Sequence, residues 1–305
     1  MDASVIARSP RGMDCLRPLR APALQQLGPS RGSIRPRRPS LVLAVAALAM
    51  IASAAGCRLT PSNDRDWAPE LSRLSTADFN GNLVTVHNVR NCDYRTEEDY
   101  DVHYDDRTYD LSRLDSVDYI LVPFGNMPRV AHTFLSFGFH GQDYAAISVE
   151  VRRLRGQDYS PIQNFVNVNE IIYIVGDERD LVRLRSNVRR DDVYIYRANT
   201  TPQQSQALFV DMLQRANKLA KEPEFYNTLT NNCTTNLVAH VNHVVPNKIP
   251  YTYQVLLPGL SDRLAFNLGL LKSSGTFEQT RTAARINRLA YIYRDSPDFS
   301  ERIRR

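Results

Sequence analysis

Hydrophobic and polar residues alternate along much of the chain between residues 83 and 197, in a pattern typical of β-strands. Gly141 and Gln142 mark a turn between two of these segments, which predicts a hairpin. Residues 91–110 are crowded with Asp, Glu, Arg and Tyr, and this composition predicts a long polar loop. The predicted strands are Leu83–Val89, Val117–Phe124, Val130–Phe139, Tyr144–Val151, Asn169–Gly176 and Asp192–Arg197.

Helical patterns dominate after the last of these strands. Thr201 and Pro202 predict the N-cap and first turn of a helix. A run of strands followed by helices favours the α+β fold class, with an antiparallel sheet packed against helices. The further predicted elements are a charged helix at Asp177–Arg185, the helix Thr234–Val244, a proline-containing loop at Pro246–Pro258 and the helix Leu260–Leu271.

The two ends of the chain differ from this central part. Leu41–Ala55 is an apolar run with the length of a signal-peptide core, and it is short for a membrane-spanning helix. Arg281–Arg305 is basic and amphipathic, and we expect a solvated helix rather than a partner site. We therefore divide the chain into a leader (1–56), a linker (57–82), a folded domain (83–272) and a basic helical tail (273–305).

The leader ends in Ala54-Ala55-Gly56-Cys57, which resembles the signal of bacterial lipoproteins, in which the cysteine becomes the lipidated N-terminus. An ordinary signal peptide and an uncleaved anchor remain alternatives. Such a leader predicts an envelope protein on the periplasmic side, held at a membrane surface by a lipid on Cys57. The long stretch before Leu41 also allows a translation start at Met13 or later.

The formal charge of the whole chain, +5, comes from the leader. Residues 1–56 carry eight arginines and two aspartates, a charge of +6, so the remaining chain carries −1. A nearly neutral body gives no support for nucleic-acid binding, despite a basic isoelectric point.

Cys233 is the strongest candidate for chemistry, because it lies at the predicted start of a helix in the segment NNCTTN. Helix N-termini carry partial positive charge and unpaired N–H groups, which stabilise a thiolate. The neighbouring Asn232 and Thr234 suit helix capping and oxyanion stabilisation. Two alternatives remain for Cys233: a buried apolar side chain, and a disulfide with Cys92.

A thiol nucleophile requires a base, and His132 is the candidate among six histidines. It lies within an apolar and aromatic strand, where an imidazole is costly unless it has partners; a core histidine with satisfied hydrogen bonds is the alternative. His140 is expected at an exposed hairpin tip. His240 and His243 share one helix face but lack a convincing third ligand, so we expect no metal and no cofactor.

The group that orients His132 should lie on the next strand. Glu150 is the leading candidate and Asp143 the second. A three-residue loop, 140–142, would pair position 132 with position 150, whereas a slip of one residue would turn Glu150 to the opposite face. A surface carboxylate paired with a neighbouring arginine is the alternative for Glu150.

Four segments together, HTFLSFGF, ISVEVRR, GDERD and NNCTTN, resemble the Lnb-type N-terminal periplasmic domain family. That family is similar to a circularly permuted branch of the papain-like and NlpC-like thiol enzymes, and the resemblance implies a Cys–His pair at Cys233 and His132. Its namesakes are lipoprotein intramolecular acyltransferases that work through a thioester. They carry transmembrane helices after the domain, whereas residues 272–305 contain no apolar run of about 20 residues.

These observations support three hypotheses. The first is a membrane-tethered cysteine-dependent acyltransferase or acyl hydrolase that acts on a lipid-modified protein. Its acyl chain would lie in an apolar groove at Cys233 lined by Phe134, Phe137, Tyr251 and Tyr253. The second is a cysteine peptidase or amidase that acts on cell-wall peptide. The third is a non-enzymatic envelope lipoprotein with a degenerate site.

Overall fold

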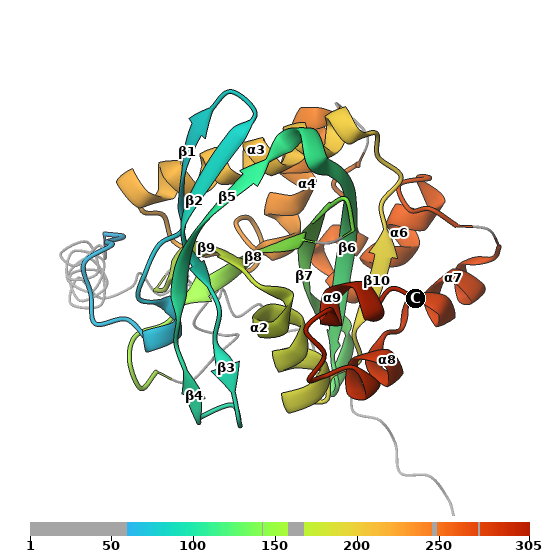
Figure 1. Cartoon of the computed structure of the whole chain (residues 1–305), viewed down its shortest axis with the longest axis horizontal. Coiled ribbons are helices and arrows are strands. Elements are labelled where there is room, and N and C mark those ends of the chain that lie inside the picture. Colours follow the sequence, from blue (N-terminus) through green and yellow to red (C-terminus); the bar gives the residue numbers. More distant parts are fainter. Residues whose placement is uncertain (1–59, 142, 158–167, 246–248, 274) are drawn as a thin grey trace, which may run out of the picture. The chain divides into compact units, whose positions relative to one another are not determined.

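The computed structural model describes residues 60–141, 143–157, 168–245, 249–273 and 275–305. The predictions about the leader, including Cys57, and about Gln142 lie outside these residues. In the described part, the centre of the molecule is an eight-stranded sheet with the order β1-β2-β9-β8-β7-β6-β10, and β5 pairs with β2 (Figure 1). The strands are β1 (Thr76–Asn80), β2 (Leu83–Arg90), β5 (Tyr104–Asp110), β6 (Leu114–Phe124), β7 (Met127–Phe139), β8 (Asp143–Arg152), β9 (Glu170–Gly176) and β10 (Tyr194–Arg197).

Among the described residues, the strand pairs of this sheet are antiparallel except for one parallel pair, between Arg90 of β2 and Gly176 of β9. A separate two-stranded sheet joins β3 (Asp93–Tyr94) and β4 (Tyr100–Asp101). The fold is therefore mixed α and β with a largely antiparallel sheet packed against helices, which confirms the predicted fold class. The circular permutation stays a prediction.

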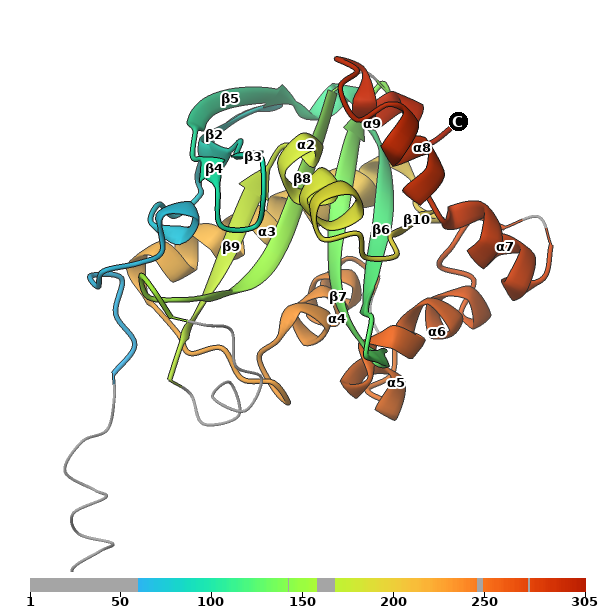
Figure 2. The same ribbon diagram turned by 90° about the horizontal axis from the view of Figure 1, so that it is seen from below.

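Helices cover both faces of the sheet (Figure 2). On one face lie α3 and α4, and on the other lie α2, α8 and α9. The helices are α2 (Glu178–Arg183), α3 (Pro202–Lys221), α4 (Cys233–Val244), α5 (Tyr253–Leu256), α6 (Ser261–Asn267), α7 (Phe277–Ala284), α8 (Asn287–Ile292) and α9 (Phe299–Arg302), with a π-helical turn, η4 (Leu184–Val188), and short 3-10 turns η1 (Pro69–Leu71), η2 (Leu111–Arg113) and η5 (Pro258–Leu260).

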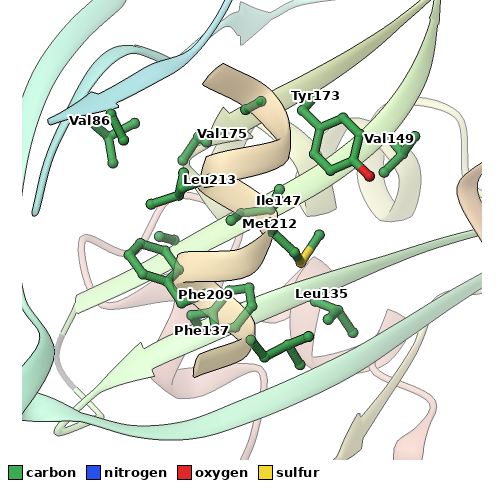
Figure 3. Packing of buried hydrophobic residues seen from close by; sticks show 14 of the residues in the cluster. Val86, Leu135, Phe137, Ile147, Val149, Tyr173, Val175, Phe209, Met212 and Leu213 are labelled. Carbon is green, nitrogen blue, oxygen red and sulfur yellow. The ribbon is translucent and has the colours of Figure 1, made fainter. Parts of the chain in front are cut away.

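The larger core lies between the sheet and α3 (Figure 3). Phe209 of α3 packs against Phe137 at 5.0 Å between ring centroids. Met212 and Leu213 extend this apolar face and are completely buried. The helix begins as predicted, because the Thr201 side chain accepts a hydrogen bond from the Gln204 N–H and the Gln204 side chain bonds back to the Thr201 N–H.

The β7–β8 hairpin has the predicted register. Phe139 pairs with Asp143 and Phe134 with Ser148, so the extension of the same register places position 132 opposite position 150. His140 and Gly141 adopt positive φ angles of 53° and 67°, which a tight turn requires.

The segment 91–110 is not a plain polar loop as predicted, because it contains β3, β4 and β5. Strand β5 pairs with β2 and buries only Tyr109 well, while its charged residues face solvent. A strand with one buried side chain in seven gives little hydrophobic periodicity, so composition alone suggested a loop.

The predicted linker and tail both belong to the fold. Strand β1 lies within 57–82 and pairs with β2. In the tail, Phe299 and Ile303 are buried in the core cluster beneath α2. The expectation of a solvated helix at 281–305 is therefore wrong: apolar residues anchor the segment, and its Arg304 pairs with the buried carboxylates of Asp118 and Glu178.

Two C-terminal predictions need smaller corrections. Of the predicted loop 246–258, residues 246–248 lie outside the described residues and the remainder contains α5, while the helix expected at 260–271 is the shorter α6. Gly269 follows α6 with a φ of 68°, a left-handed conformation that ends a helix. Within the part of the chain that the structure describes, no helix has both the length and the apolar character to cross a bilayer.

Candidate active site

The structure brings Cys233 and His132 together, although 100 residues separate them in sequence. Cys233 is the first residue of α4, and its N-cap is Asn232, whose side chain accepts a hydrogen bond from the Thr235 N–H at 2.9 Å. His132 lies on β7, two residues before Phe134, which pairs with Ser148 of β8. Each of the two groups shifts the pKa of the other, so the thiol and the imidazole lie within interaction range.

The other side of the His132 ring is held by a chain of polar groups. Its Nε2 lies 2.7 Å from the Ser148 hydroxyl and 3.2 Å from Glu150 Oε1. Ser148 donates to the same Glu150 oxygen at 2.7 Å, and Arg185 donates to it at 2.7 Å. With Nε2 engaged in this way, Nδ1 is the ring nitrogen that remains for the thiol. Thiol catalysis needs a nucleophile, a base and an orienting group, and Cys233, His132 and Glu150 are the candidates for these three roles.

Each member of the pair shifts the pKa of the other in the direction that favours the charged form. Burial opposes the ionisation of Cys233, but the hydrogen bond to His132 and its charge outweigh burial and lower the pKa of the thiol to about 7. Burial likewise opposes protonation of His132, but the Glu150 carboxylate outweighs it and raises the pKa of the imidazole to about 9. Between these values the pair is a thiolate and an imidazolium.

Glu150 stays ionised despite its burial. Desolvation raises its pKa, but the charges of His132 and Arg185 dominate and hold the pKa well below its usual range. The side chain of Arg185 is only 6% exposed, so its charge acts on Glu150 with little screening by water.

Backbone N–H groups lie near Cys233. The backbone of Thr133 helps to lower the pKa of the thiol, after the larger effects of burial and His132. At the start of α4, the Asn232 side chain accepts a hydrogen bond from the Thr235 N–H. The N–H groups of Cys233 and Thr234 have no acceptor within the helix, because they belong to its first turn. Donors of this kind can stabilise an oxyanion that forms on a carbonyl attacked by the thiolate.

A family model described as the Lnb N-terminal periplasmic domain matches residues 100–259, slightly more than half of the chain. The chain belongs to this family. The matched residues include Cys233, His132 and Glu150, and membership of a family of periplasmic domains assigns the protein to the periplasmic side of the cell envelope. No curated protein and no solved structure matches the chain.

An apolar pocket of about 150 Å³ lies beside the candidate site of this Lnb-type domain. It runs along α4 from Thr234, the residue after the nucleophile, through Leu237 to Val241. The opposite walls come from β7 and from the segments around α5 and α6, including Leu135, Val255 and Leu264.

The four residues predicted to line this pocket do not line it. Phe134 and Phe137 are both fully buried, but they belong to core clusters on opposite sides of the sheet. Tyr251 and Tyr253 are exposed, at 59% and 64%. The prediction of an apolar groove beside Cys233 is supported by the pocket, whereas its lining is corrected.

A buried polar network supports the start of α4 from behind. Asp211 lies 2.5 Å from His240 Nδ1, and His240 Nε2 lies 2.7 Å from the Tyr173 hydroxyl. Tyr173 donates to Asn236 Oδ1 at 2.9 Å, and the Asn236 amide donates to the backbone carbonyl of Asn232 at 2.9 Å. His240 therefore has a structural partner on each side.

Other candidates lie away from the site. Asp143 pairs with Phe139 at the far end of the hairpin and its side chain is 66% exposed, so it does not approach His132. Cys92 and Cys233 are both free thiols and form no disulfide. Within the described residues, no group of three or more His, Cys, Asp or Glu side chains is placed to hold a metal ion.

Sequence reasoning missed Ser148, Arg185 and Thr133. Ser148 had a usable signal, since it lies two residues before Glu150 and therefore on the same face of β8. Arg185 had none, because it is brought to Glu150 by the packing of the turn η4 against the sheet.

Proposed function

We propose that this Lnb-type domain is a cysteine-dependent acyltransferase or acyl hydrolase of the cell envelope. The observation that carries the proposal is the proximity of Cys233 to His132, whose ring is held by Ser148 and Glu150. A thiol pKa of about 7 makes the nucleophile available near neutral pH without a cofactor.

The chemistry would proceed in two steps. The Cys233 thiolate attacks the carbonyl carbon of an ester, and the N–H groups of Thr133 and Thr234 stabilise the oxyanion. As the C–O bond breaks, the His132 imidazolium gives its proton to the departing alkoxide, which leaves a thioester on the sulfur and a neutral imidazole. His132 then takes a proton from an incoming amine or water, which attacks the thioester and releases the thiolate.

The pocket supports an acyl substrate over a peptide. Its walls are formed mainly by Leu, Val, Ile and Ala side chains, and it begins at the residue that follows Cys233. A cell-wall peptide would require a polar cleft with groups that pair its amides and charges. We therefore favour the acyl chain of a lipid-modified protein as the transferred group.

We also propose that Cys57 carries a lipid that tethers the domain to a membrane. The small residues Ala54-Ala55-Gly56 before it suit the processing of a lipoprotein signal. A Cys57→Ser variant would then lose the hydrophobic N-terminal modification in mass spectrometry of the mature protein.

The experiment uses the full chain and a synthetic diacylglyceryl-cysteine peptide in detergent micelles. We expect peptide mass spectrometry to find an acyl group on Cys233 that hydroxylamine removes. The Cys233→Ala and His132→Ala variants should form none, and Cys92 in the same sample is the internal control. Release of new amines from peptidoglycan, with no acyl group on Cys233, would contradict the proposal and favour a peptidase.

A further inference from the structure

Large hydrophobic side chains are exposed around α5. They come from three segments: the β6–β7 turn and its flank (125–131), the loop before α4 (225–232) and the segment of α5 and η5 (249–260). We call these segments together the α5 surface. Its exposed hydrophobic residues are Met127 at 50%, Leu229 at 49%, Tyr251 at 59%, Tyr253 at 64% and Leu256 at 40%.

Direct contacts join the three segments. The Tyr251 hydroxyl donates to the Leu229 carbonyl at 2.6 Å, which ties the α5 segment to the loop before α4. Gly259 of η5 packs so closely on Pro128 and Arg129 that a Cβ at this position would overlap the strand backbone. The exposed side chains therefore belong to one continuous region, and patches of this kind mark interaction sites.

The α5 surface is also almost free of charge. Its 27 residues include a single charged one, Arg129, whereas the chain as a whole has 23% charged residues, which would give about six. The polar residues are mainly Asn and Thr, and two of the three tyrosines, Tyr251 and Tyr253, are exposed. Neutral segments with exposed Tyr and Leu are typical of proteins that lie in a membrane interface, where the headgroups accept the polar atoms and the acyl region accepts the apolar ones.

The path of the chain favours a membrane over a protein as the occupant. The described chain begins at Thr60, next to the loop before α4: the Ser62 N–H donates to Glu170 at 2.9 Å, and Glu170 pairs with Phe225 at the start of that loop. Cys57 precedes Thr60 by three residues, a reach of about 10 Å in an extended chain. The apolar run Leu41–Ala55 lies just before it. Attachment through a lipid on Cys57, or through an uncleaved Leu41–Ala55 segment, would hold the loop before α4 toward the bilayer.

We propose that the α5 surface is a membrane-docking surface that inserts Leu229, Tyr253 and Leu256 into the interface of a zwitterionic lipid bilayer. Leu229 lies three residues before Asn232, the N-cap of α4, and the Asn232 side chain donates to the Thr228 carbonyl at 2.6 Å, so docking would place the entrance of the site at the lipid surface. Val255, which lines the apolar pocket, lies between Tyr253 and Leu256 in the sequence. Helix α5 would therefore contact lipid through Tyr253 and Leu256, and the pocket through Val255. The inference does not depend on the reaction proposed for Cys233.

The test places a fluorescent reporter on each side of the molecule. In the full chain bound to phosphatidylcholine vesicles, a Tyr253→Trp variant reports on the α5 surface. A Tyr291→Trp variant, on α8, is the matched control because Tyr291 is exposed to a similar degree, 68% against 64%. The unsubstituted protein measures the background of Trp67, which is buried beneath Arg152.

Vesicles with bromine atoms on the acyl chains quench tryptophan that reaches them. We expect the Tyr253→Trp variant to lose about half or more of its added emission, because the apolar side chains of interfacial segments lie about 5–10 Å into the headgroup and acyl boundary. The Tyr291→Trp variant should lose almost none. Equal quenching of the two variants, or quenching of neither, would overturn the proposal. Alkylation of Cys233 in the same samples reports separately on the chemistry.

Discussion

Arg304 holds the C-terminal segment to the sheet and to α2, and its substitution gives a sharp test of that packing. Its guanidinium donates to Glu178 at 2.5 Å and to Asp118 at 2.7 Å, and it lies 3.9 Å from the centre of the Tyr144 ring. Both carboxylates are buried, with side-chain exposures of 0% and 2%. An Arg304→Gln variant would remove the cation that pairs with Glu178, while the Ser136 hydroxyl would still donate to that carboxylate.

The expected cost follows from the loss of a buried charge partner. Removing one member of a buried ion pair typically lowers the free energy of unfolding by about 3–5 kcal/mol. For a domain of this size, that loss corresponds to a fall in Tm of about 6–20 °C. Asp118 keeps an ion pair with Arg197 at 2.9 Å, so most of the loss should come from Glu178.

Thermal and urea denaturation followed by circular dichroism would measure the change. The matched control is Arg305→Gln, because Arg305 pairs with Glu301 at the surface with 58% of its side chain exposed. Such pairs contribute about 0–1 kcal/mol. Adding Glu178→Gln to the Arg304→Gln variant should restore part of the lost stability, since it removes the unpaired charge. Equal Tm values for Arg304→Gln and Arg305→Gln would refute the packing role of the tail.

Two further predictions concern the site. A Glu150→Gln variant should lower the pKa of His132 from about 9 toward its ordinary value and raise that of Cys233, because the carboxylate that favours the imidazolium is gone. The alkylation rate of Cys233, measured against pH, should then show its inflection at a higher pH. An unchanged inflection would exclude Glu150 as the orienting charge. A Val241→Trp variant should block the apolar pocket and reduce acylation by a long-chain donor at least about tenfold, the loss that about 1.4 kcal/mol of binding would cause. A short-chain donor is the control, and equal losses for both donors would show that the pocket does not hold the acyl chain.

The pairing of β7 with β8 could be predicted because side chains alternate strictly along a strand. A three-residue connection between Phe139 and Asp143 pairs position 132 with position 150, and this pairing places Glu150 on the same face of the sheet as His132. The same parity argues against placing Phe134 and Phe137 in one groove, since residues three apart in a strand point to opposite faces. Their opposite locations in the structure reflect that rule.

Contacts between distant segments could not be read from the sequence. Arg185 reaches Glu150 only because η4 packs over β8, and Arg304 reaches Asp118 across 186 residues. Without knowledge of such partners, a tail rich in arginine resembles a solvated helix. Strand β5 was not predicted for a related reason. It lies at the polar surface, and it is held by backbone pairing with β2, which leaves no apolar pattern in the sequence.

The most direct test of the central claim is the pH dependence of Cys233 alkylation by iodoacetamide, resolved by peptide mass spectrometry. We predict an inflection near pH 7 in the parent chain, while Cys92 stays unreactive because burial raises its pKa to about 12. In a His132→Ala variant the inflection should rise to about 9 or above, since burial then acts without the imidazolium. At pH 7 the thiolate fraction would fall from about one half to about one hundredth, a loss of rate of about 50-fold. An inflection near the ordinary cysteine value that is unchanged by His132→Ala would contradict the proposed thiolate–imidazolium pair.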